Sequence, residues 1–277
     1  MRDIMLMDLH THTTASDGSL SPAELVARAA ALRVSCLSIT DHDSIGAYAA
    51  LPDRVIGGVT VIPGIEFSTT WSGRNIHVLG LNIDPHNEIL QRGIQHQQTA
   101  RNQRAEKIAY RLRTTGINEL LEKVRLAANG ATIGRPHFAQ VLVDEGSVAN
   151  LKQAYRKFLG NGKPGDVRQY WAEMTHVIDW ICASGGTAVL AHPLHYQLTA
   201  TKLRQLCTEF KASGGQAIEV CNGIQTEALT QKLAVLCEDL ELLASCGSDF
   251  HHGGNSWSEI GKFSPLPASC RPVWDHW

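Results

Sequence analysis

The sequence lacks the cysteine spacing of a disulfide framework or of a zinc knuckle. Its seven cysteines are scattered over 277 residues, are odd in number and include no Cys-x-x-Cys pair. They are Cys36, Cys182, Cys207, Cys221, Cys237, Cys246 and Cys270. Most lie within apolar runs, where a buried thiol is the common role. We therefore expect structural cysteines in a protein of the reducing cytoplasm.

The sequence also lacks long apolar runs and a strong charge. No stretch approaches the roughly 18 apolar residues that a membrane helix requires. The apolar first residues are interrupted by Asp3 and Asp8, so we expect neither a signal peptide nor a membrane span. The formal net charge is -2, whereas a general nucleic-acid binder is usually basic. A phosphate-bearing substrate would therefore be attracted by a local site, and no protein partner is indicated.

Short β-type runs alternate with helical segments, a pattern typical of βα units around a parallel sheet. The predicted strands cover residues 4–10, 34–40, 59–67, 75–83, 187–191, 217–221 and 243–248. Pro63 and Gly64 must bend or shorten the third of these strands. The first helix is predicted from Ser21-Pro22-Ala23-Glu24, a capping box with proline at the first helical position. Further helices are expected over residues 170–184, 202–212 and 227–240.

The spacing of apolar residues changes from a mixture of strand and helix patterns to a helical pattern in the middle of the chain. Residues 87–113, 118–128, 136–144 and 151–158 are predicted to be helices, with no strand between them. We assign residues 101–165 to a small helical insertion domain that caps the substrate, and residues 1–100 and 166–277 to a metal-binding barrel. Four basic residues of the insertion follow helical spacing and are expected to form an exposed face, with guidance of a polynucleotide as the alternative. They are Arg101, Arg104, Lys107 and Arg111.

Histidines and carboxylates collect at the predicted strand ends. His10 and His12 are two residues apart, so they project to the same side of an extended segment. Catalytic side chains of parallel βα folds gather at the carboxyl ends of the strands. A single histidine at a strand end usually forms a hydrogen bond within a loop. Nine histidines and carboxylates at such positions are not expected by chance. The nine are His10, His12, Asp17, His42, Glu66, His77, His192, Asp249 and His251. A ligand set of imidazole and carboxylate without thiolate suits Mn²⁺, Fe²⁺ or Zn²⁺, and the carboxylate oxygens among the ligands favour Mn²⁺.

Motifs at these positions resemble the PHP (polymerase and histidinol phosphatase) family over residues 6–252. The motifs are His10-x-His12, Thr40-Asp41-His42-Asp43, Gly64-Ile65-Glu66, His77, Ala191-His192-Pro193 and Gly247-Ser248-Asp249-Phe250-His251. The resemblance implies a distorted seven-stranded (βα) barrel, an α/β fold, with two or three metal ions. It places His10, His12, Glu66 and Asp249 on one ion. It makes Glu66 the bridge to a second ion completed by His77 and His192, and gives Asp17, His42 and His251 to a third.

The segment Gly134-Arg135-Pro136-His137 resembles one branch of this family. That branch contains 3′,5′-nucleoside-bisphosphate phosphatases and ribonuclease AM-like 5′→3′ exonucleases. Pro136 is placed to begin a helix, so Arg135 and the first free amides would face an anion, and an arginine can grip a phosphate with two hydrogen bonds. The alternative is that Arg135 pairs with an acid of the barrel. Lys163 is a second candidate for phosphate binding, although most loop lysines are only solvated.

These observations predict a metal-dependent phosphoesterase. We expect it to hydrolyse the 3′-phosphate of nucleoside 3′,5′-bisphosphates by attack of a metal-bridging hydroxide at Glu66, and to trim short 5′-phosphorylated RNA. Asp43, His137 and a metal-bound water are open candidates for the proton donor, and His137 is also a candidate for substrate binding. The alternatives are a histidinol-phosphate phosphatase, which needs no second phosphate grip, and a regulatory domain that binds nucleotide without turnover. An amide hydrolase is disfavoured because no candidate for a carbamylated lysine lies at a strand end.

Overall fold

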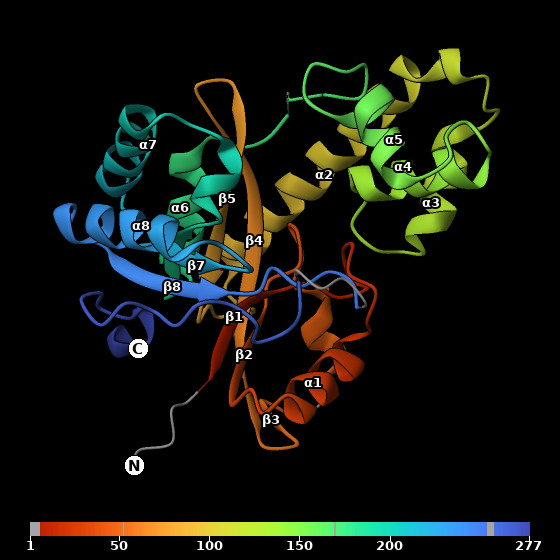
Figure 1. Cartoon of the computed structure of the whole chain (residues 1–277). Helices are drawn as coiled ribbons and strands as arrows, with labels where there is room; N and C mark the ends of the chain where they lie inside the picture. Colours follow the sequence, from red (N-terminus) through yellow and green to blue (C-terminus); the bar gives the residue numbers. More distant parts are fainter. Residues whose placement is uncertain (1–5, 52, 169, 254–257) are drawn as a thin grey trace.

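A computed structural model describes residues 6–51, 53–168, 170–253 and 258–277 (Figure 1). Its strands are β1 (Met7–Thr11), β2 (Cys36–Ile39), β3 (Val55–Ile56), β4 (Val59–Trp71), β5 (Arg74–Leu81), β6 (Thr187–Leu190), β7 (Ala217–Asn222) and β8 (Leu243–Gly247). The first predicted strand, residues 4–10, begins outside the described residues. The main path of the sheet runs β1-β2-β4-β5-β6-β7-β8, and the short β3 pairs with β4.

The two ends of this path meet. The His12 amide donates to the Phe250 carbonyl at 2.9 Å, and the Asp249 amide donates to the His10 carbonyl at 2.9 Å. The seven strands of the main path therefore form a nearly closed barrel, which confirms the predicted fold class. The contacts also bring the end of β1 beside the segment that follows β8.

The barrel is not all parallel, which corrects the expectation of a parallel sheet. β5 runs antiparallel to both β4 and β6. Only Ser72 and Gly73 separate β4 from β5, and both have positive φ values, 47° and 71°. A two-residue connection of this kind closes a hairpin and leaves no room for the helix of a βα unit.

Pro63 and Gly64 do not shorten β4, which has 13 residues. Instead the strand changes partners at this point, from β2 up to Pro63 to β5 from Gly64 onward. A side chain at Gly64 would collide with Ser38 and Thr40, because its Cβ would lie 2.3 Å from the Ser38 Oγ and 2.9 Å from the Thr40 Cγ2. Glycine thus allows the close approach that lets one strand serve both halves of the barrel.

Helices cover the outside of the barrel. They are α1 (Pro22–Ala31), α6 (Met174–Ala183), α7 (Ala200–Ala212) and α8 (Glu227–Asp239). The predicted capping box of α1 is present, with Ser21 and Glu24 bonded reciprocally. Leu25 of α1 and Phe210 of α7 are fully buried, and each such side chain contributes about 1.5–3 kcal/mol of burial. In Figure 1, α7 and α8 lie on the opposite side of the barrel from the helices in the middle of the chain.

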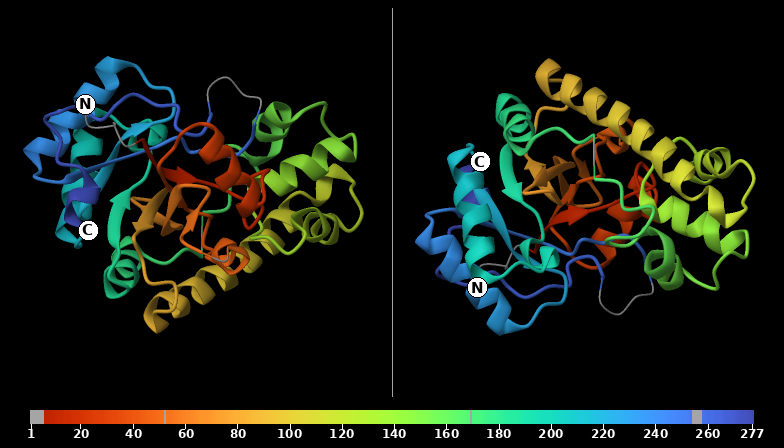
Figure 2. Two further views of the ribbon diagram at one scale, coloured as in Figure 1. Left: turned by 90° about the horizontal axis from the view of Figure 1, so that it is seen from below. Right: turned by 90° about the horizontal axis from the view of Figure 1, so that it is seen from above.

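Those middle helices are α2 (Glu88–Arg111), α3 (Leu120–Ala128), α4 (Arg135–Asp144) and α5 (Leu151–Ala154), followed by a π-helical turn (Tyr155–Leu159). They share a hydrophobic core of their own, which includes Ile108, Val124, Phe138 and Leu142. We call residues 105–167, which span this core, the helical unit. The views in Figure 2 show α2 running without a break from the barrel into the unit. The insertion boundaries 101–165 stay a prediction, and the first of them falls within α2.

All seven cysteines are free thiols, and all but Cys182 are buried. Among the described residues, no helix combines the length and the apolar character needed to cross a membrane.

Candidate metal centre

The structure brings together the nine side chains predicted as metal ligands. They form four overlapping groups, and within each group the ligand atoms all lie within 4.8 Å of one another. The groups are His10, His12 and Glu66; His42, Glu66 and His77; His10, His192 and Asp249; and His12, Asp17, His42 and His251. β1, β4 and β5 carry His10, Glu66 and His77 directly. The others lie in the segments after β1, β2, β6 and β8.

Glu66 lies at the centre of the cluster and is fully buried. Its Oε1 is 2.8 Å from the Nδ1 of His77 and 2.9 Å from the Nε2 of His192. Its Oε2 is 2.9 Å from the Nδ1 of His42 and 3.3 Å from the Nε2 of His12. One carboxylate therefore faces several imidazoles with both oxygens, as a bridging ligand would.

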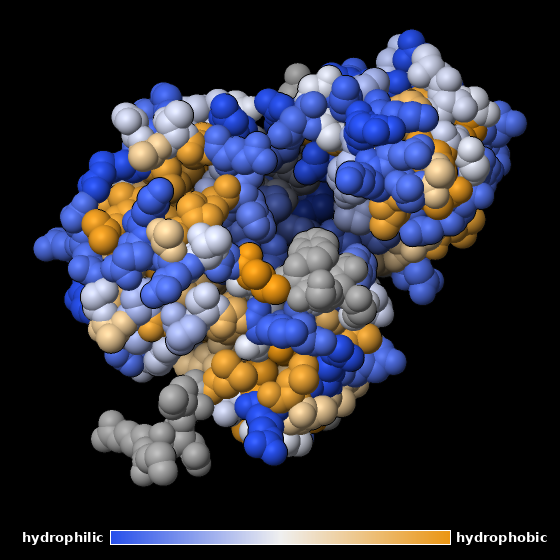
Figure 3. Space-filling model, viewed as in Figure 1, coloured by the Kyte–Doolittle hydropathy of each residue, from blue (hydrophilic) through white to orange (hydrophobic). Residues whose placement is uncertain are grey.

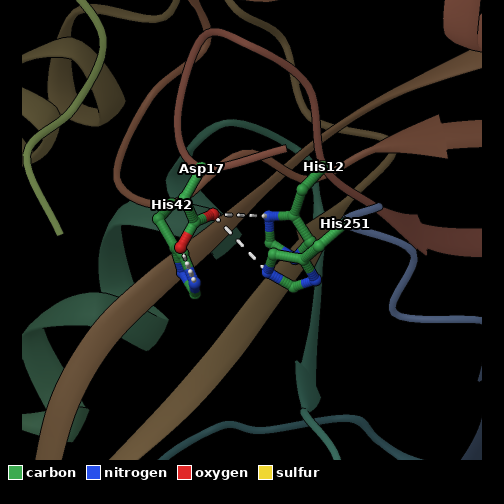
Figure 4. Close-up of side chains that lie close together, drawn as sticks. All are labelled: His12, Asp17, His42 and His251. Atoms are coloured by element: carbon green, nitrogen blue, oxygen red, sulfur yellow. Dashed lines mark ion pairs between the residues drawn. The ribbon is translucent and has the colours of Figure 1, made fainter. Parts of the chain in front are cut away.

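Asp17 organises a second part of the cluster (Figure 4). Its carboxylate faces three rings, at 3.5 Å from His251, 3.8 Å from His42 and 3.9 Å from His12. The rings of His12 and His251 stack with centroids 4.0 Å apart. These distances are longer than ordinary hydrogen bonds, so the side chains converge without being bonded to one another.

The chemistry of the donor set fits bound cations. Several buried nitrogen and oxygen atoms of the cluster have no hydrogen-bond partner among the described residues, although a buried polar atom normally has one. They are His10 Nε2, both ring nitrogens of His12, Asp17 Oδ1, His42 Nδ1, Glu66 Oε2 and His192 Nδ1. Unpaired lone pairs that face one another at this depth are what divalent ions ligated by imidazole and carboxylate require.

The same crowding shifts the acid–base equilibria of the cluster. Burial alone would raise the pKa of Glu66, but the rings of His42 and His77 hold it well below its usual range. Burial lowers the pKa of His42, yet the carboxylates of Glu66 and Asp17 outweigh it and raise the value to about 9. Burial and the neighbouring His251 lower the pKa of His12 to about 3. The anionic carboxylates are thus stabilised by the imidazoles around them.

Glu219 also belongs to this centre, although it is not one of the predicted site residues. It is fully buried on β7. Its two carboxylate oxygens lie 3.1 and 3.2 Å from the Nδ1 of His10, and Oε2 accepts the backbone N–H of His192 at 2.7 Å. A carboxylate on Nδ1 turns the Nε2 lone pair of His10 toward the cluster. The signal that could have identified Glu219 is a single acid within the apolar run Ala217-Ile218-Glu219-Val220-Cys221.

His192 needs this support because its backbone is unusual. Its φ is 28°, a positive value that few non-glycine residues adopt. Asp249 is similar, with a φ of 53°. Such conformations are held in place by their surroundings and are common at functional sites. The bond from the His192 amide to Glu219 is one of these constraints.

A polar cavity of about 210 Å³ lies between the metal centre and the helical unit. Its lining residues are Asp17, His42, Ser68, Asn75, His77, Arg101, Arg104, Gly134, Arg135, Pro136, Tyr155 and Trp171. In Figure 3 the molecule is hollowed, with hydrophilic residues around the hollow, where the barrel meets the helical unit. Ligand side chains of the barrel and guanidinium groups from α2 and α4 therefore share one cavity.

Two of these guanidinium groups correct the expectation of an exposed basic face. Arg101 and Arg104 are buried, with exposed fractions of 6% and 5%. Both guanidinium groups lie over the ring of Trp171, at 5.2 and 5.3 Å from its centroid. Helical spacing identified the shared face of α2, but this face packs inward instead of meeting solvent.

Comparison with known proteins identifies the family. The family model described as PHP domain matches residues 8–179. The chain belongs to the PHP family. It is 38% identical to a protein of Chromobacterium violaceum named 3′,5′-nucleoside bisphosphate phosphatase, covering 97% of this chain and 95% of the relative. It is 41% identical to the 5′-3′ exoribonuclease Rnm of Escherichia coli, covering 99% of this chain and 94% of the relative.

Solved structures agree with this membership. A structure from Chromobacterium violaceum, described as an amidohydrolase with bound sulfate and no metal, superposes with a TM-score of 0.88 at 37% identity. The superposition covers 98% of this chain and 95% of the chain in the solved structure. A structure from Bifidobacterium adolescentis shares the fold at 24% identity and a TM-score of 0.78, with coverages of 96% and 92%. The predictions of a PHP fold, of the family branch and of a hydrolytic enzyme are confirmed.

The assignment of PHP ligands to individual ions stays a prediction. The group His10, His12 and Glu66 contains three of the four ligands that the resemblance gives to the first ion, whereas Asp249 falls in a group with His10 and His192. His42, however, contributes both to a group with Glu66 and His77 and to a group with Asp17. These overlapping groups therefore do not assign His42 to a single ion.

The remaining predicted residues lie around the PHP centre rather than in it. Asp43 is fully buried, and its carboxylate is paired with the Arg101 Nε at 2.7 Å and accepts the Ser68 amide at 2.8 Å. This geometry does not favour Asp43 as a proton donor and gives it the role of holding Arg101. The Nδ1 of His137 accepts the Gly134 amide at 3.0 Å and so shapes the start of α4. His137 and the exposed Lys163 are not among the residues that line the cavity.

Proposed function

We propose that this PHP enzyme removes the 3′-phosphate from nucleoside 3′,5′-bisphosphates and trims short 5′-phosphorylated RNA from its 5′ end. The observation that carries the proposal is the shared cavity, in which metal-competent side chains lie opposite three guanidinium groups. The metal-competent side chains can hold the phosphate that reacts, and the guanidinium groups can bind the phosphate that does not. The names of the two relatives, one a bisphosphate phosphatase and the other an exoribonuclease, support the same pair of substrates.

Both reactions break the same bond. Water adds to phosphorus, the bond from phosphorus to the 3′ oxygen breaks, and that oxygen takes a proton. A bisphosphate gives a nucleoside 5′-phosphate and inorganic phosphate. RNA gives a nucleoside 5′-phosphate and a chain shorter by one nucleotide with a new 5′-phosphate. One arrangement of side chains therefore serves both substrates.

The nine clustered side chains would hold two or three ions, which we propose to be Mn²⁺, with Zn²⁺ or Fe²⁺ as alternatives. Bound ions of this kind lower the pKa of water and neutralise phosphoryl oxygens. The chain's own contribution is to fix the ligands. Glu66 faces the imidazoles with both oxygens, and Glu219 orients His10 and the backbone of His192. A rigid set of ligands needs little rearrangement when the substrate reacts.

Arg104 and Arg135 are the proposed grip on the second phosphate. The Nε of Arg104 donates to the Val167 carbonyl at 2.8 Å, and the Nη1 of Arg135 donates to the Leu159 carbonyl at 3.2 Å. Burial, followed by the charges of Arg135 and Arg101, lowers the pKa of Arg104 to about 9. Like charges held together in this way favour a bound anion, which relieves their repulsion.

The position of Arg135 adds to this grip. It is the first residue of α4, and Gly134, Arg135 and Pro136 at this helix start all line the cavity. The N-terminus of a helix carries free amides and a partial positive charge, which favour a bound anion. Pro136, the next residue, fits a first turn because it has no amide to leave unpaired. The helical unit therefore acts as the substrate cap in this proposal. The proton for the 3′ oxygen comes from water, since Asp43 is ion-paired.

The alternatives are less well supported. Histidinol phosphate has one phosphate and would leave the guanidinium groups of the cavity without an anion. A binding domain without turnover is disfavoured because the full ligand set is present and the relatives are named as hydrolases. We retain the cytoplasm as the proposed location, in keeping with the free thiols.

A substrate panel tests the proposal. Phosphate release by the Mn²⁺-loaded protein is compared for adenosine 3′,5′-bisphosphate, adenosine 3′-phosphate, adenosine 5′-phosphate and histidinol phosphate. We expect the bisphosphate to exceed the 3′-phosphate in kcat/KM by at least about tenfold, because one charge-assisted phosphate contact contributes about 1.5–3 kcal/mol. Preference for histidinol phosphate would refute the second-phosphate grip and leave the metal centre in place.

A further inference from the structure

A second cavity borders the metal centre. Its volume is about 250 Å³, and the segments after β6 and β7 form it together with the start of α8. Its lining includes His192, Leu194, His195, Asn222, Ile224 and Leu229. None of them belongs to the helical unit, so this cavity is separate from the one beneath Arg135.

His192 connects the two cavities. It lines the second cavity, and its ring lies 5.2 Å from the ring of His77, which lines the first. Its Nε2 is 2.9 Å from the central carboxylate of Glu66. A phosphate held at the cluster would therefore have one cavity on the side of His77 and the other on the side of His192.

The lining of the second cavity suits a flat, uncharged ring. Leu194, Ile224 and Leu229 supply apolar surface, and none of the lining residues is a lysine or an arginine. The ring of His195 is stacked on that of His192 with an interplanar angle of 17°. Asn222 is 8% exposed, and its amide nitrogen has no partner among the described residues. Apolar walls, a flat ring and an unpaired amide are the features by which proteins bind a nucleobase.

We propose that this cavity binds the base of the second nucleotide of a 5′-phosphorylated RNA. The inference rests on the proposed function. If the first nucleotide has its 5′-phosphate under Arg135 and its 3′-phosphate at the cluster, the next nucleotide is attached to that reacting phosphate. It must leave the cluster by a side that the first nucleotide does not fill, and the cavity at His192 lies on such a side. A bisphosphate has no second nucleotide, so the cavity acts on RNA alone.

Two dinucleotides test this inference. Both carry a 5′-phosphorylated adenosine, followed by a second adenosine in one and by an abasic ribose in the other. We measure kcat/KM for each with the Mn²⁺-loaded protein, and for adenosine 3′,5′-bisphosphate in parallel. The dinucleotide with two bases is expected to react about tenfold faster than the abasic one, because stacking of one base typically contributes an effect of this order.

A pair of variants locates the effect. Ile224→Glu places a charge in the cavity, in the segment between β7 and α8, and Val235→Glu places the same charge on α8, outside the lining. Both positions are exposed, at 62% and 48%, so neither supports the core. We expect Ile224→Glu to remove the tenfold advantage of the second base and Val235→Glu to keep it.

Each outcome decides the inference. Equal rates on the two dinucleotides in the unmodified protein overturn it, as does an equal loss of the advantage in both variants. Bisphosphate turnover without any advantage of the second base overturns this inference alone. If neither the bisphosphate nor the dinucleotides are hydrolysed, the proposed function is overturned, and the inference with it.

Discussion

The barrel rim and the helical unit face the same cavity, yet their polar groups are satisfied in different ways. At the rim, six histidines and three carboxylates converge, and several of their buried atoms have no hydrogen-bond partner among the described residues. On the other side of the cavity, Arg104 of α2 and Arg135 of the cap are anchored by backbone carbonyls and keep further N–H groups for a ligand. The difference separates two tasks. Changes at the rim should act on metal binding and turnover, and changes in the cap on affinity for the second phosphate.

The largest expected effect follows from Glu66→Gln. An amide cannot supply two anionic oxygens to the imidazoles that Glu66 now faces, so phosphate release should fall by at least about a thousandfold. With a chelator present, so that bound ions stabilise neither protein, the thermal midpoint of unfolding should stay close to that of Glu106→Gln, a control on the exposed surface of α2. Persistent turnover in Glu66→Gln would contradict a bridging role.

Glu219→Gln tests the support behind the ligands. Metal ligands that lose the partner of their second nitrogen typically bind the ion about 10- to 100-fold more weakly. We expect a loss of this size in Mn²⁺ affinity, measured by competition with a chelator, while the far-ultraviolet circular dichroism is unchanged. Unaltered affinity would show that His10 and His192 are positioned without this carboxylate.

Removal of the metal should destabilise the protein. A ligand at about 100 times its dissociation constant adds about 2.7 kcal/mol to the free energy of unfolding. For a chain of this size, that corresponds to a rise of about 5–10 °C in the thermal midpoint. Calorimetry with excess Mn²⁺ and with a chelator measures the difference. Equal midpoints would indicate that the clustered side chains do not bind the ion.

The smallest expected effect concerns Lys163, a sequence-based candidate for phosphate binding. It is exposed and absent from the cavity lining. Surface substitutions of this kind usually change a free energy by at most about 0.5 kcal/mol, which is about twofold. Lys163→Ala should therefore keep kcat/KM for the bisphosphate within that factor. A tenfold loss would restore Lys163 as a phosphate contact.

The sequence was sufficient to predict the barrel and the side chains that converge at its rim, because both depend on local signals. Residues two apart on a strand point the same way, which made His10 and His12 a pair. The motifs around Glu66 and Asp249 then matched one family in every ligand position. The prediction of a phosphate grip at Arg135 relied on a proline at a helix start, and the structure places Arg135 as the first residue of α4.

Features that depend on tertiary contacts were not predictable in the same way. The antiparallel β5 follows from the turn at Ser72-Gly73, which was not recognised as a hairpin signal. Helical spacing put Arg101 and Arg104 on one face but could not tell that Trp171, about 70 residues away in sequence, covers it. Glu219 acts on His10 and His192, which are distant in sequence, and its local signal is limited to one acid within an apolar run.

The most direct test of the division between rim and cap is the effect of Arg135→Ala on two substrates. We measure kcat/KM for adenosine 3′,5′-bisphosphate and adenosine 3′-phosphate, with Arg92→Ala on the exposed surface of α2 as the control. Loss of a charge-assisted contact should lower the value for the bisphosphate by about 10- to 100-fold and leave the 3′-phosphate nearly unchanged. An equal fall for both substrates would contradict the account, because it would place Arg135 at the reacting phosphate instead of the second one.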